Sequence, residues 1–563
     1  MPERARRMVP VIAYIIACFV GGLCSRANGS RRPSWILLGV CALLCVLYLT
    51  VDETSLPGFS LSSLSIGETG DTARRAPHWR EPRAPIPGMN WVLRLNNSTV
   101  AAAFASVRRL GTSATAARLG CAFYLLGAAA ILVQPRYGLY LILFCALVGD
   151  ARLFPWYPFV KGFSSRESLF FVHDAFIVSP LELYIVLMAV SWSARWIWQG
   201  KLRLYTGQLF WPALAFVAFL VFGLAHGLAS GGDPRMALWE ARNVFYLVPL
   251  MLLTSNLTET PRHVKTALSI VLTALFIKGV TGSLYYLLVL RSDLSGIESF
   301  TEHGTAMHLN SLFVASLAVW MYKSALPKRI LLPCTIPFVL LGYIAMQRRA
   351  AFITLAIAFA LVLALLYKER RRLFWRLAPA VVIMGGGYVA ASWNSQGTLA
   401  VPAQAIKSVY AAQLASGRDR SSNNYRGLEN RNINFTIHRH PFAGIGFGQK
   451  FSMVVAMPNI SQFFEWWEYI THNSIMWIWM KAGIGGFCSL LYLFGLAVVA
   501  GVRALGRLPR DGLKPAVLTA TLYIVMHFIY ACVDMSWDAG STVFVGTMLG
   551  VVNSAEWIET QRQ

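Results

Sequence analysis

Charged residues are scarce in this sequence. Asp, Glu, Lys and Arg together make up 13% of the 563 residues, whereas hydrophobic residues make up 56% and the mean hydropathy is +0.52. A soluble protein has no core large enough for so much apolar side chain. Apolar runs of about 17–25 residues, the length that crosses a bilayer, recur along the chain instead. The composition therefore predicts a polytopic membrane protein and excludes an ordinary soluble enzyme.

Acidic residues are few beside the basic ones, and cysteine motifs are absent. Lys and Arg outnumber Asp and Glu by 50 to 26, but many of the basic residues fall in short loops between apolar runs, so no nucleic-acid partner is expected. The nine cysteines lie in or beside apolar runs without CxxC or Cys/His spacing, and they are expected to be packing residues. There is no Asp-x-Asp pair of the kind that nucleotide-sugar transferases use to hold a metal. We therefore expect a reaction without a metal or a cofactor.

The apolar runs predict an all-α fold with roughly 12–15 transmembrane helices. Five regions are expected: membrane spans at 1–51, a polar Arg/Pro-rich and poorly ordered insertion at 52–117, a transmembrane core at 118–392, a large external loop with short helices at 393–473, and C-terminal membrane helices at 474–555. The candidate spans are 9–24, 34–51, 119–133, 137–149, 176–197, 208–228, 243–256, 266–290, 306–322, 330–346, 351–367, 377–392, 474–500, 515–533 and 539–553.

Basic loops orient the chain. Five basic loops fall on one side of the membrane if the spans from 176 onward alternate: QGKLRLYTG, TETPRHVK, YKSALPKR, YKERRRLFWR and VRALGRLPRDGLK. Basic loops mark the cytoplasmic side, so the 393–473 loop is expected to be external. Counting back places Met1 outside, although MPERARR favours the inside. One early span is then miscounted. The short pair 119–133 and 137–149, joined by QPR, is expected to be a re-entrant hairpin.

The external loop has the pattern of a folded segment. Apolar residues recur with helical spacing over 425–438 and predict a short amphipathic helix, which the His-Pro pair at 440–441 stops. The glycines of GIGFG, at 444–448, then predict a tight turn with close backbone approach. GIGFG does not follow a strand of a βαβ unit, so it is no nucleotide-binding signature.

These segments resemble the C-terminal signature of the O-antigen ligase and O-antigen polymerase superfamily. The order of the motifs is the one that the family shows: Arg426 followed by a helix, then HPFAGIGFG, then an aromatic spacer, then THNSIMWIWMKAGIGG. Upstream, IAMQRRAAFITLAIAF resembles a family segment with an arginine at the outer end of a span, with Arg348 or Arg349 in that place. A second family segment resembles LWEARNVFYLVPLM, and this resemblance places Arg242 near the outer surface. The resemblance covers roughly 176–555.

The resemblance implies a fold like that of C-type glycosyltransferases, in the inner membrane of a bacterium, with the active site facing the periplasm. Such enzymes move a glycan from a polyprenyl diphosphate lipid to a hydroxyl of an acceptor glycan. Guanidinium groups stay charged and bind phosphate oxygens in pairs, which assigns Arg242, Arg348, Arg349 and Arg426 to the diphosphate. His472 is expected to take the proton of the acceptor hydroxyl, because an imidazole titrates near neutral pH.

Two asparagines are expected near the same site. Asn473 is suited to hold sugar hydroxyls or to fix the imidazole of His472, and it can also cap the helix that follows. Asn310 stands near the outer end of a span, where the family often carries an asparagine, and is expected to line the pocket.

Other polar residues are weaker candidates. The pair Glu302-His303 and nearby His308 could line a pocket. Asp534 and Asp538 are expected to shape a turn rather than to take part in catalysis. Lys481 lies well inside a span, where a buried ion pair or a snorkelling side chain is the ordinary explanation.

Several functions remain open. A polymerase of an exported polysaccharide, O-antigen or exopolysaccharide, is slightly favoured by the size of the chain, with a chain-length regulator as a further partner beside membrane lipid. An O-antigen ligase with a lipid A core acceptor, or a protein-directed ligase, would use the same donor. A transporter or flippase would need polar residues in mid-membrane, broken helices or inverted repeats, which are scarce or not visible. A structural or signalling protein would give His472 and the arginines no special role.

Overall fold

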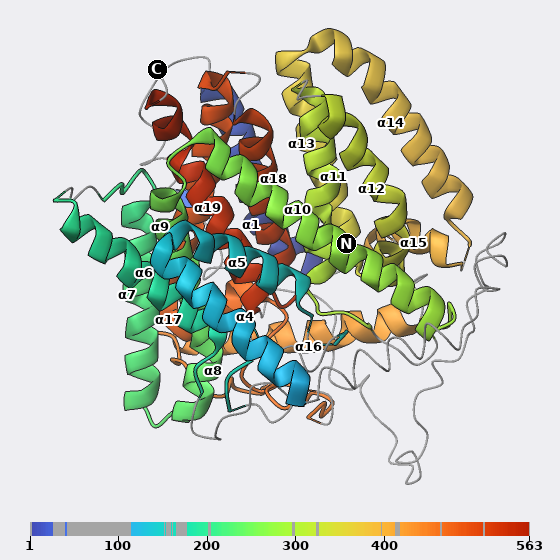
Figure 1. The fold of residues 1–563 in the computed structure, drawn as a ribbon. Helices are drawn as coiled ribbons and strands as arrows, with labels where there is room; N and C mark the ends of the chain where they lie inside the picture. The colour runs from blue at the N-terminus through green and yellow to red at the C-terminus, as the bar shows by residue number, and fades with distance from the viewer. Residues whose placement is uncertain are drawn as a thin grey trace.

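The computed structural model describes residues 3–25, 40–41, 114–150, 152–153, 159, 161–164, 177–200, 204–294, 299–322, 326–395, 397–410, 417–461, 464–509 and 513–561. Every regular element in these ranges is a helix (Figure 1). The expected span at 34–51, except for 40–41, and the polar insertion up to 113 lie outside the described residues.

The helices follow the apolar runs closely. Seven are long and apolar enough to cross a membrane, and five shorter apolar helices accompany them within the described ranges. The prediction of an all-α polytopic membrane protein is confirmed. The helices are α1 (Glu3–Ser25), α4 (Ala114–Val133), α5 (Pro135–Val148), α6 (Pro180–Trp198), α7 (Phe210–Ala229), α8 (Pro234–Phe245), α9 (Leu247–Leu257), α10 (Pro261–Leu284, continued by a π-helical turn at Tyr285–Val289), α11 (Thr305–Met321), α12 (Leu326–Ala345), α13 (Arg349–Glu369), α14 (Arg371–Ser392), a 3₁₀ turn (Thr398–Ala400), α15 (Val401–Tyr410), α16 (Gly417–Arg439), α17 (Ser474–Arg507), α18 (Lys514–Ala531) and α19 (Ala539–Thr560).

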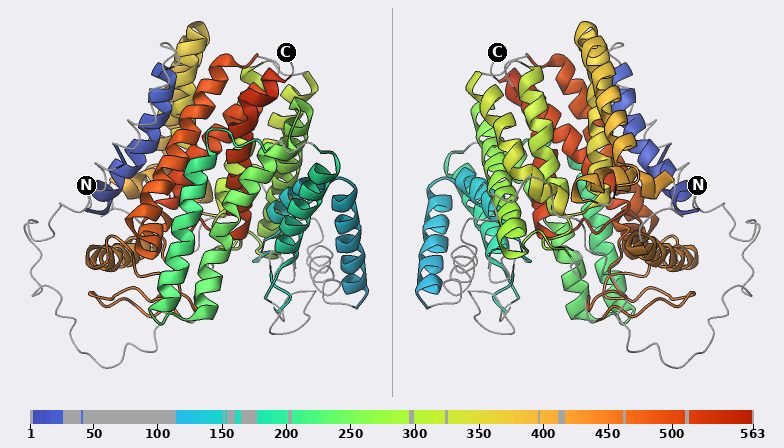
Figure 2. Two further views of the ribbon diagram at one scale, coloured as in Figure 1. Left: turned by 90° about the vertical axis from the view of Figure 1, so that its left-hand side faces the viewer. Right: turned by 90° about the vertical axis from the view of Figure 1, so that its right-hand side faces the viewer.

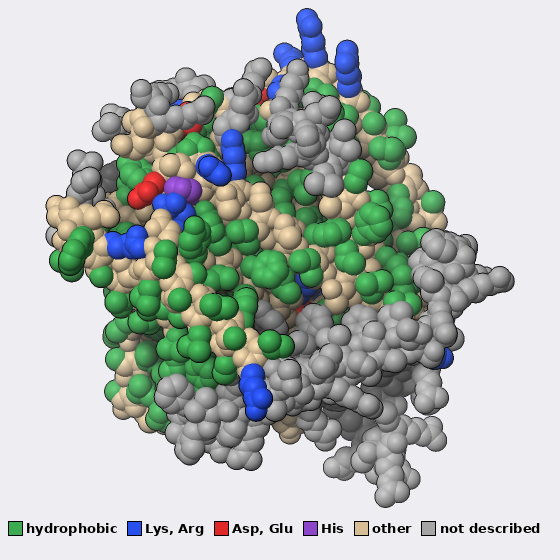
Figure 3. All heavy atoms as spheres, in the orientation of Figure 1, with side chains coloured by type: hydrophobic (Ala, Val, Ile, Leu, Met, Phe, Trp, Pro, Cys, Tyr) green, Lys and Arg blue, Asp and Glu red, His purple; other side chains and the backbone are tan. Residues whose placement is uncertain are grey.

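The core of the bundle is built around α17 and α18. α17 packs against α1, α7, α18 and α19, and every residue of α18 is buried. α14 has no buried residue and stands at the edge of the bundle (Figure 1). Hydrophobic side chains cover much of the outer face seen in Figure 3, as expected of a bundle whose surroundings are lipid rather than water.

One end of the bundle carries the crosswise helix α16. It runs across the long helices in Figure 1 and is seen nearly end-on in Figure 2. The starts of α11, α13 and α17 and the end of α18 lie at this end, whereas the starts of α10, α14 and α18, which stand in three of the basic segments, lie at the other (Figure 1). Lys and Arg side chains accordingly stand out at the upper edge of Figure 3, away from α16.

The sequence placed the end of α16 correctly and its start too late. α16 begins at Gly417 rather than near 425. The sequence pattern missed its first two turns because they are almost wholly polar and show no apolar period. Asp419 lies in the first turn, where a carboxylate interacts favourably with the helix dipole.

The glycine segment 444–448 enters the bundle after α16 ends. Its three glycines have φ of +70°, +83° and +80°, and α17 is kinked at Gly483, where φ is +69°. The N–H of Ile445 donates to the carbonyl of Met480 at 2.7 Å, so the turn and the kinked helix are joined backbone to backbone. The predicted close approach is confirmed, and it explains why side chains are missing here.

Lys481 forms a buried ion pair beside this kink. Its Nζ lies 2.7 Å from Oε1 of Glu240 in α8, and both side chains are fully buried. Nζ also donates to the carbonyl of Gln449, and the N–H of Gly448 donates to Oε2 of Glu240, each at 2.5 Å. The expectation of a buried pair is confirmed, and the pair ties α8 and α17 to the glycine segment.

Candidate active site

Asp534 is the centre of a charged cluster at the α16 end of the bundle. It lies in the turn between α18 and α19, and its side chain is 3% exposed. Its Oδ2 lies 3.6 Å from Nη2 of Arg426 in α16 and 3.9 Å from Nη1 of Arg348. Its Oδ1 lies 3.1 Å from Nδ1 of His303, and the hydroxyl oxygen of Tyr530 lies 3.1 Å from Oδ2.

The charges of this cluster fix its protonation states. Burial alone would raise the pKa of Asp534, but Arg426, His303 and Arg348 together hold the pKa well below its usual range. The carboxylate is therefore ionised. Burial, with the positive charge of Arg348, lowers the pKa of His303 to about 4, so this imidazole is neutral near pH 7.

His472 lies beside the cluster and has its own carboxylate partner. Both carboxylate oxygens of Glu429 lie 3.1 Å from its Nδ1, and the backbone N–H of His472 donates to Glu429 Oε2 at 3.0 Å. The ring of Tyr425 packs edge-on against the imidazole, with centroids 5.8 Å apart. The rings of His303 and His472 are 6.5 Å apart, so the two groups form one site.

α16 brings three of these side chains to the site. Tyr425, Arg426 and Glu429 lie within one turn of this helix, where residues three and four positions apart are neighbours. α17 fixes the other side, because Asn473 caps its first turn by accepting a hydrogen bond from the N–H of Met476 at 3.2 Å. The expected capping role of Asn473 is confirmed, and His472 is thereby held just before a helix N-terminus.

The turn between α12 and α13 separates the two adjacent arginines. Gln347 has a φ of +54°, and Arg348 follows it as the N-cap residue of α13. Arg348 turns inward to Asp534, whereas Arg349 turns to the first turns of α16, with Nε 3.5 Å from Asp419 Oδ1. Arg348 is therefore the arginine that contacts the cluster.

Arg348 has unused hydrogen-bonding capacity. Its Nε and Nη2 are buried and have no hydrogen-bond partner among the described residues. Buried donors are normally paired, and a charged group left unpaired is costly. A bound anion would supply the oxygen atoms that a guanidinium fork takes in pairs.

Two other candidate residues lie apart from this cluster. Arg242 of α8 is paired with Glu182 of α6, with Nε 3.1 Å from Oε1 and Nη2 2.6 Å from Oε2. Asn310 is fully buried. Its amide donates to the carbonyl of Ala351 at 2.9 Å and accepts from the hydroxyl of Tyr343 at 2.7 Å, so it joins α11, α12 and α13 and has no group free for a sugar in this structure.

Sequence reasoning missed the two carboxylates. Asp534 stands in DMSWDAG, where it reads as a turn residue, and only its contacts with segments far along the chain reveal its place. Glu429 lies on the buried side of α16, where its side chain is 2% exposed. Its spacing of three residues from Arg426 is the one sequence signal that could have joined them.

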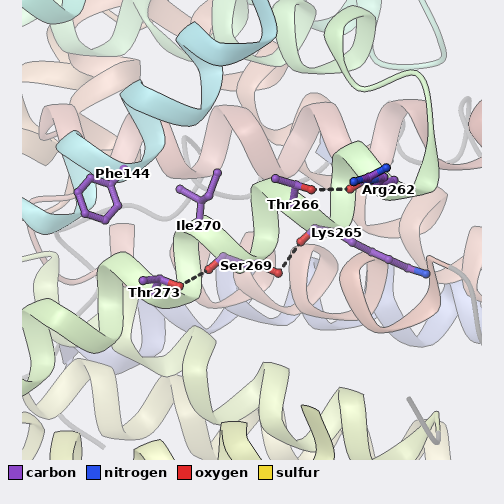
Figure 4. A pocket seen from close by; sticks show the side chains of 7 residues that line it. All are labelled: Phe144, Arg262, Lys265, Thr266, Ser269, Ile270 and Thr273. Atoms are coloured by element: carbon purple, nitrogen blue, oxygen red, sulfur yellow. Dashed lines mark hydrogen bonds between the residues drawn. The ribbon is translucent and has the colours of Figure 1, made fainter. Parts of the chain in front are cut away.

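An open groove lies along α10, away from these residues. It has a volume of about 610 Å³ and lies against α5, as Figure 4 shows. Its hydroxyl side chains donate to carbonyls of their own helix, for example Thr273 to Ser269 at 2.8 Å. The groove contains none of the candidate residues. It is lined by Phe144, Arg262, Lys265, Thr266, Ser269, Ile270 and Thr273.

Comparison with known families agrees with the motifs. Residues 334–491 match the family model described as O-antigen ligase. No curated protein matches the chain. The matched range contains Arg348, Arg349, Arg426 and the His472-Asn473 pair. The match confirms the resemblance to the O-antigen ligase and polymerase superfamily and supports a membrane protein of that functional type.

Proposed function

We propose that this chain, which carries an O-antigen ligase domain over residues 334–491, moves a glycan from a polyprenyl diphosphate lipid onto a sugar hydroxyl. The observation that carries the proposal is the meeting of Arg348, Arg426 and His472 at one end of a membrane bundle. The donor glycan is anchored in the bilayer by its lipid, so an enzyme must bind it at a membrane face. Its leaving group is an anion, which needs cations placed where the charge develops.

Arg348 and Arg426 are proposed to bind the diphosphate. Asp534 lies between their guanidinium groups and neutralises one of the two charges, so the arginines stand close together without mutual repulsion. The unpaired Nε and Nη2 of Arg348 are the proposed donors to phosphate oxygens; both are buried in this structure, so the guanidinium must shift when the diphosphate binds. Arg349 supports this site from the start of α13, and Arg242, already paired with Glu182, is left outside it.

His472 is proposed to be the general base. The carboxylate of Glu429 accepts the hydrogen of Nδ1, which leaves Nε2 free to take a proton. The acceptor hydroxyl oxygen bonds to the anomeric carbon of the donor, the bond from that carbon to the diphosphate oxygen breaks, and the hydroxyl proton passes to Nε2. The polyprenyl diphosphate leaves with the electron pair. Glu429 stabilises the imidazolium that forms, and Asn473 helps to hold the segment in place.

The proposed site faces the periplasm of a bacterial inner membrane. Basic segments mark the cytoplasmic side of membrane proteins, and here the basic starts of α10, α14 and α18 lie at the end of the bundle opposite α16. The lipid-linked donor would reach the cluster from the outer leaflet, and the acceptor from the periplasm. No metal or cofactor is needed in this scheme, because arginines neutralise the leaving group.

Polymerase activity on an exported polysaccharide is our preferred form of the proposal, with an O-antigen ligase as the alternative. A deletion strain complemented with wild type or His472→Ala distinguishes them by gel analysis of surface glycans. Loss of long chains with single repeats still attached identifies a polymerase. Undecorated core with lipid-linked long chains accumulating identifies a ligase.

The matched control is His438→Ala, because His438 is an exposed histidine on α16 away from the cluster. It is expected to restore normal glycans. Normal glycans with His472→Ala, together with altered uptake of a solute by the strain, would contradict both enzymes and favour a transporter.

A further inference from the structure

His303 is a second imidazole in the site, and the mechanism above makes no use of it. It precedes α11, and its side chain is 22% exposed. Its Nδ1 lies 3.1 Å from Asp534 Oδ1, and its backbone carbonyl accepts the hydroxyl of Tyr530 at 2.6 Å. The ring is therefore held to the turn between α18 and α19, and the backbone to the last turn of α18.

The tautomer of His303 follows from its partner. An ionised carboxylate can only accept a hydrogen bond, so Nδ1 must carry the hydrogen that Asp534 receives. Nε2 is then an acceptor with a free lone pair. No hydrogen bond to Nε2 is made by any residue that the structure describes, and the partly exposed ring leaves room for a ligand there.

The two imidazoles differ in the charged groups around them. His472 faces a carboxylate of its own, whereas His303 shares Asp534 with Arg348 and Arg426. A proton on His303 would add a third positive charge around one carboxylate. His303 is therefore unsuited to be the base, and its Nε2 stays a hydrogen-bond acceptor near neutral pH.

We infer that Nε2 of His303 accepts a hydrogen bond from a hydroxyl or amide N–H on the sugar that is bonded to the diphosphate. This inference rests on the proposed function, since it takes the diphosphate to lie at Arg348. His303 and Arg348 contact opposite oxygens of the same Asp534 carboxylate, so a group at His303 lies within about one sugar ring of the phosphate. His303 would thus select the first sugar of the donor and reject one without a donor group at that position.

Two lipids separate this role from phosphate binding. The affinities of purified full-length protein in lipid nanodiscs are measured for the lipid-linked glycan and for polyprenyl diphosphate without sugar. His303→Ala is expected to weaken binding of the glycan-bearing lipid about 3–10-fold, the worth of one hydrogen bond, and to leave the bare diphosphate unchanged. His303→Gln, whose amide oxygen accepts, is expected to recover part of the loss.

The other outcomes are also decisive. An equal loss of affinity for both lipids would show that His303 acts through Asp534 on the phosphate site. Unchanged affinity for both lipids would show that His303 does not contact the donor. Either result overturns the inference and leaves the proposed function standing. Arg348→Ala is expected to weaken both lipids. If it weakens neither, the proposed diphosphate site itself fails. His303→Phe, which keeps a ring, replaces the alanine variant if that variant does not fold, and His438→Ala is the control expected to bind both lipids normally.

Discussion

Glu429 contacts His472 at both its ring and its backbone. Its carboxylate lies 3.1 Å from Nδ1 and accepts the backbone N–H of the same residue at 3.0 Å. Since the two residues come from α16 and from the loop before α17, this double contact fixes both the tautomer and the direction of the imidazole. The position of the crosswise helix thereby controls the proposed base.

Glu429→Gln should lower turnover about 10²-fold, because the neutral amide no longer stabilises the imidazolium or selects its tautomer. Donor binding should be unchanged, since the arginines are untouched. Steady-state release of polyprenyl diphosphate by purified protein measures both quantities. Glu468→Gln, which removes the partly exposed partner of Lys450 in the loop that precedes α17, is the matched control. Unchanged turnover in Glu429→Gln would contradict the role of the dyad.

Arg348→Lys should lower turnover by about 10²–10³-fold, because an ammonium group cannot reproduce the fork offered to the phosphate oxygens. Arg426→Lys should act in the same direction. The readout is the rate of donor consumption at saturating acceptor, normalised to folded protein.

Arg242→Lys is the comparison for these variants. Its salt bridge to Glu182 joins α8 to α6, so the substitution should lower the unfolding temperature and leave turnover per folded molecule near that of wild type. A large loss of turnover here, with unchanged stability, would return Arg242 to the diphosphate site.

Sequence motifs located the site only in part. Arg426 and His472 stand in family motifs, and the apolar runs predicted most described helices, because membrane length and composition leave few choices. Asp534 could not be found in this way. It lies 231 residues from His303, and a contact between segments so distant has no local pattern. The choice between Arg348 and Arg349 likewise depended on one turn, at Gln347, whose φ no composition predicts.

Lys481→Met should destabilise the protein by about 3–5 kcal/mol, because it leaves Glu240 charged and unpaired in the core. Glu240→Gln alone should also destabilise. The double variant Lys481→Met/Glu240→Gln should recover much of the loss, since no charge is left buried. Thermal unfolding in detergent measures all three variants; a double variant less stable than both single ones would contradict the pairing.

Acid should destabilise the fold partly through His303. Its pKa of about 4, set by burial and Arg348, is below the ordinary value of 6.5. Between these values the unfolded chain binds a proton that the folded chain refuses, so stability falls as pH falls from 6.5 to 4. Asp534, with its pKa held well below the ordinary value, loses its contribution only below about pH 4.

The pH effect is checked by comparing unfolding temperatures of wild type and His303→Gln across that window. The variant should show a shallower fall, because one titrating group is gone. Parallel curves would show that His303 titrates as it does in the unfolded chain.

The most direct measurement is the release of polyprenyl diphosphate from its lipid-linked glycan by the purified chain, with a second lipid-linked repeat or a lipid A core offered as acceptor. We predict release by wild type and by His438→Ala with one of the two acceptors, and a loss of about 10²-fold or more in His472→Ala. No release by wild type with either acceptor, or equal release by His472→Ala, would contradict the account.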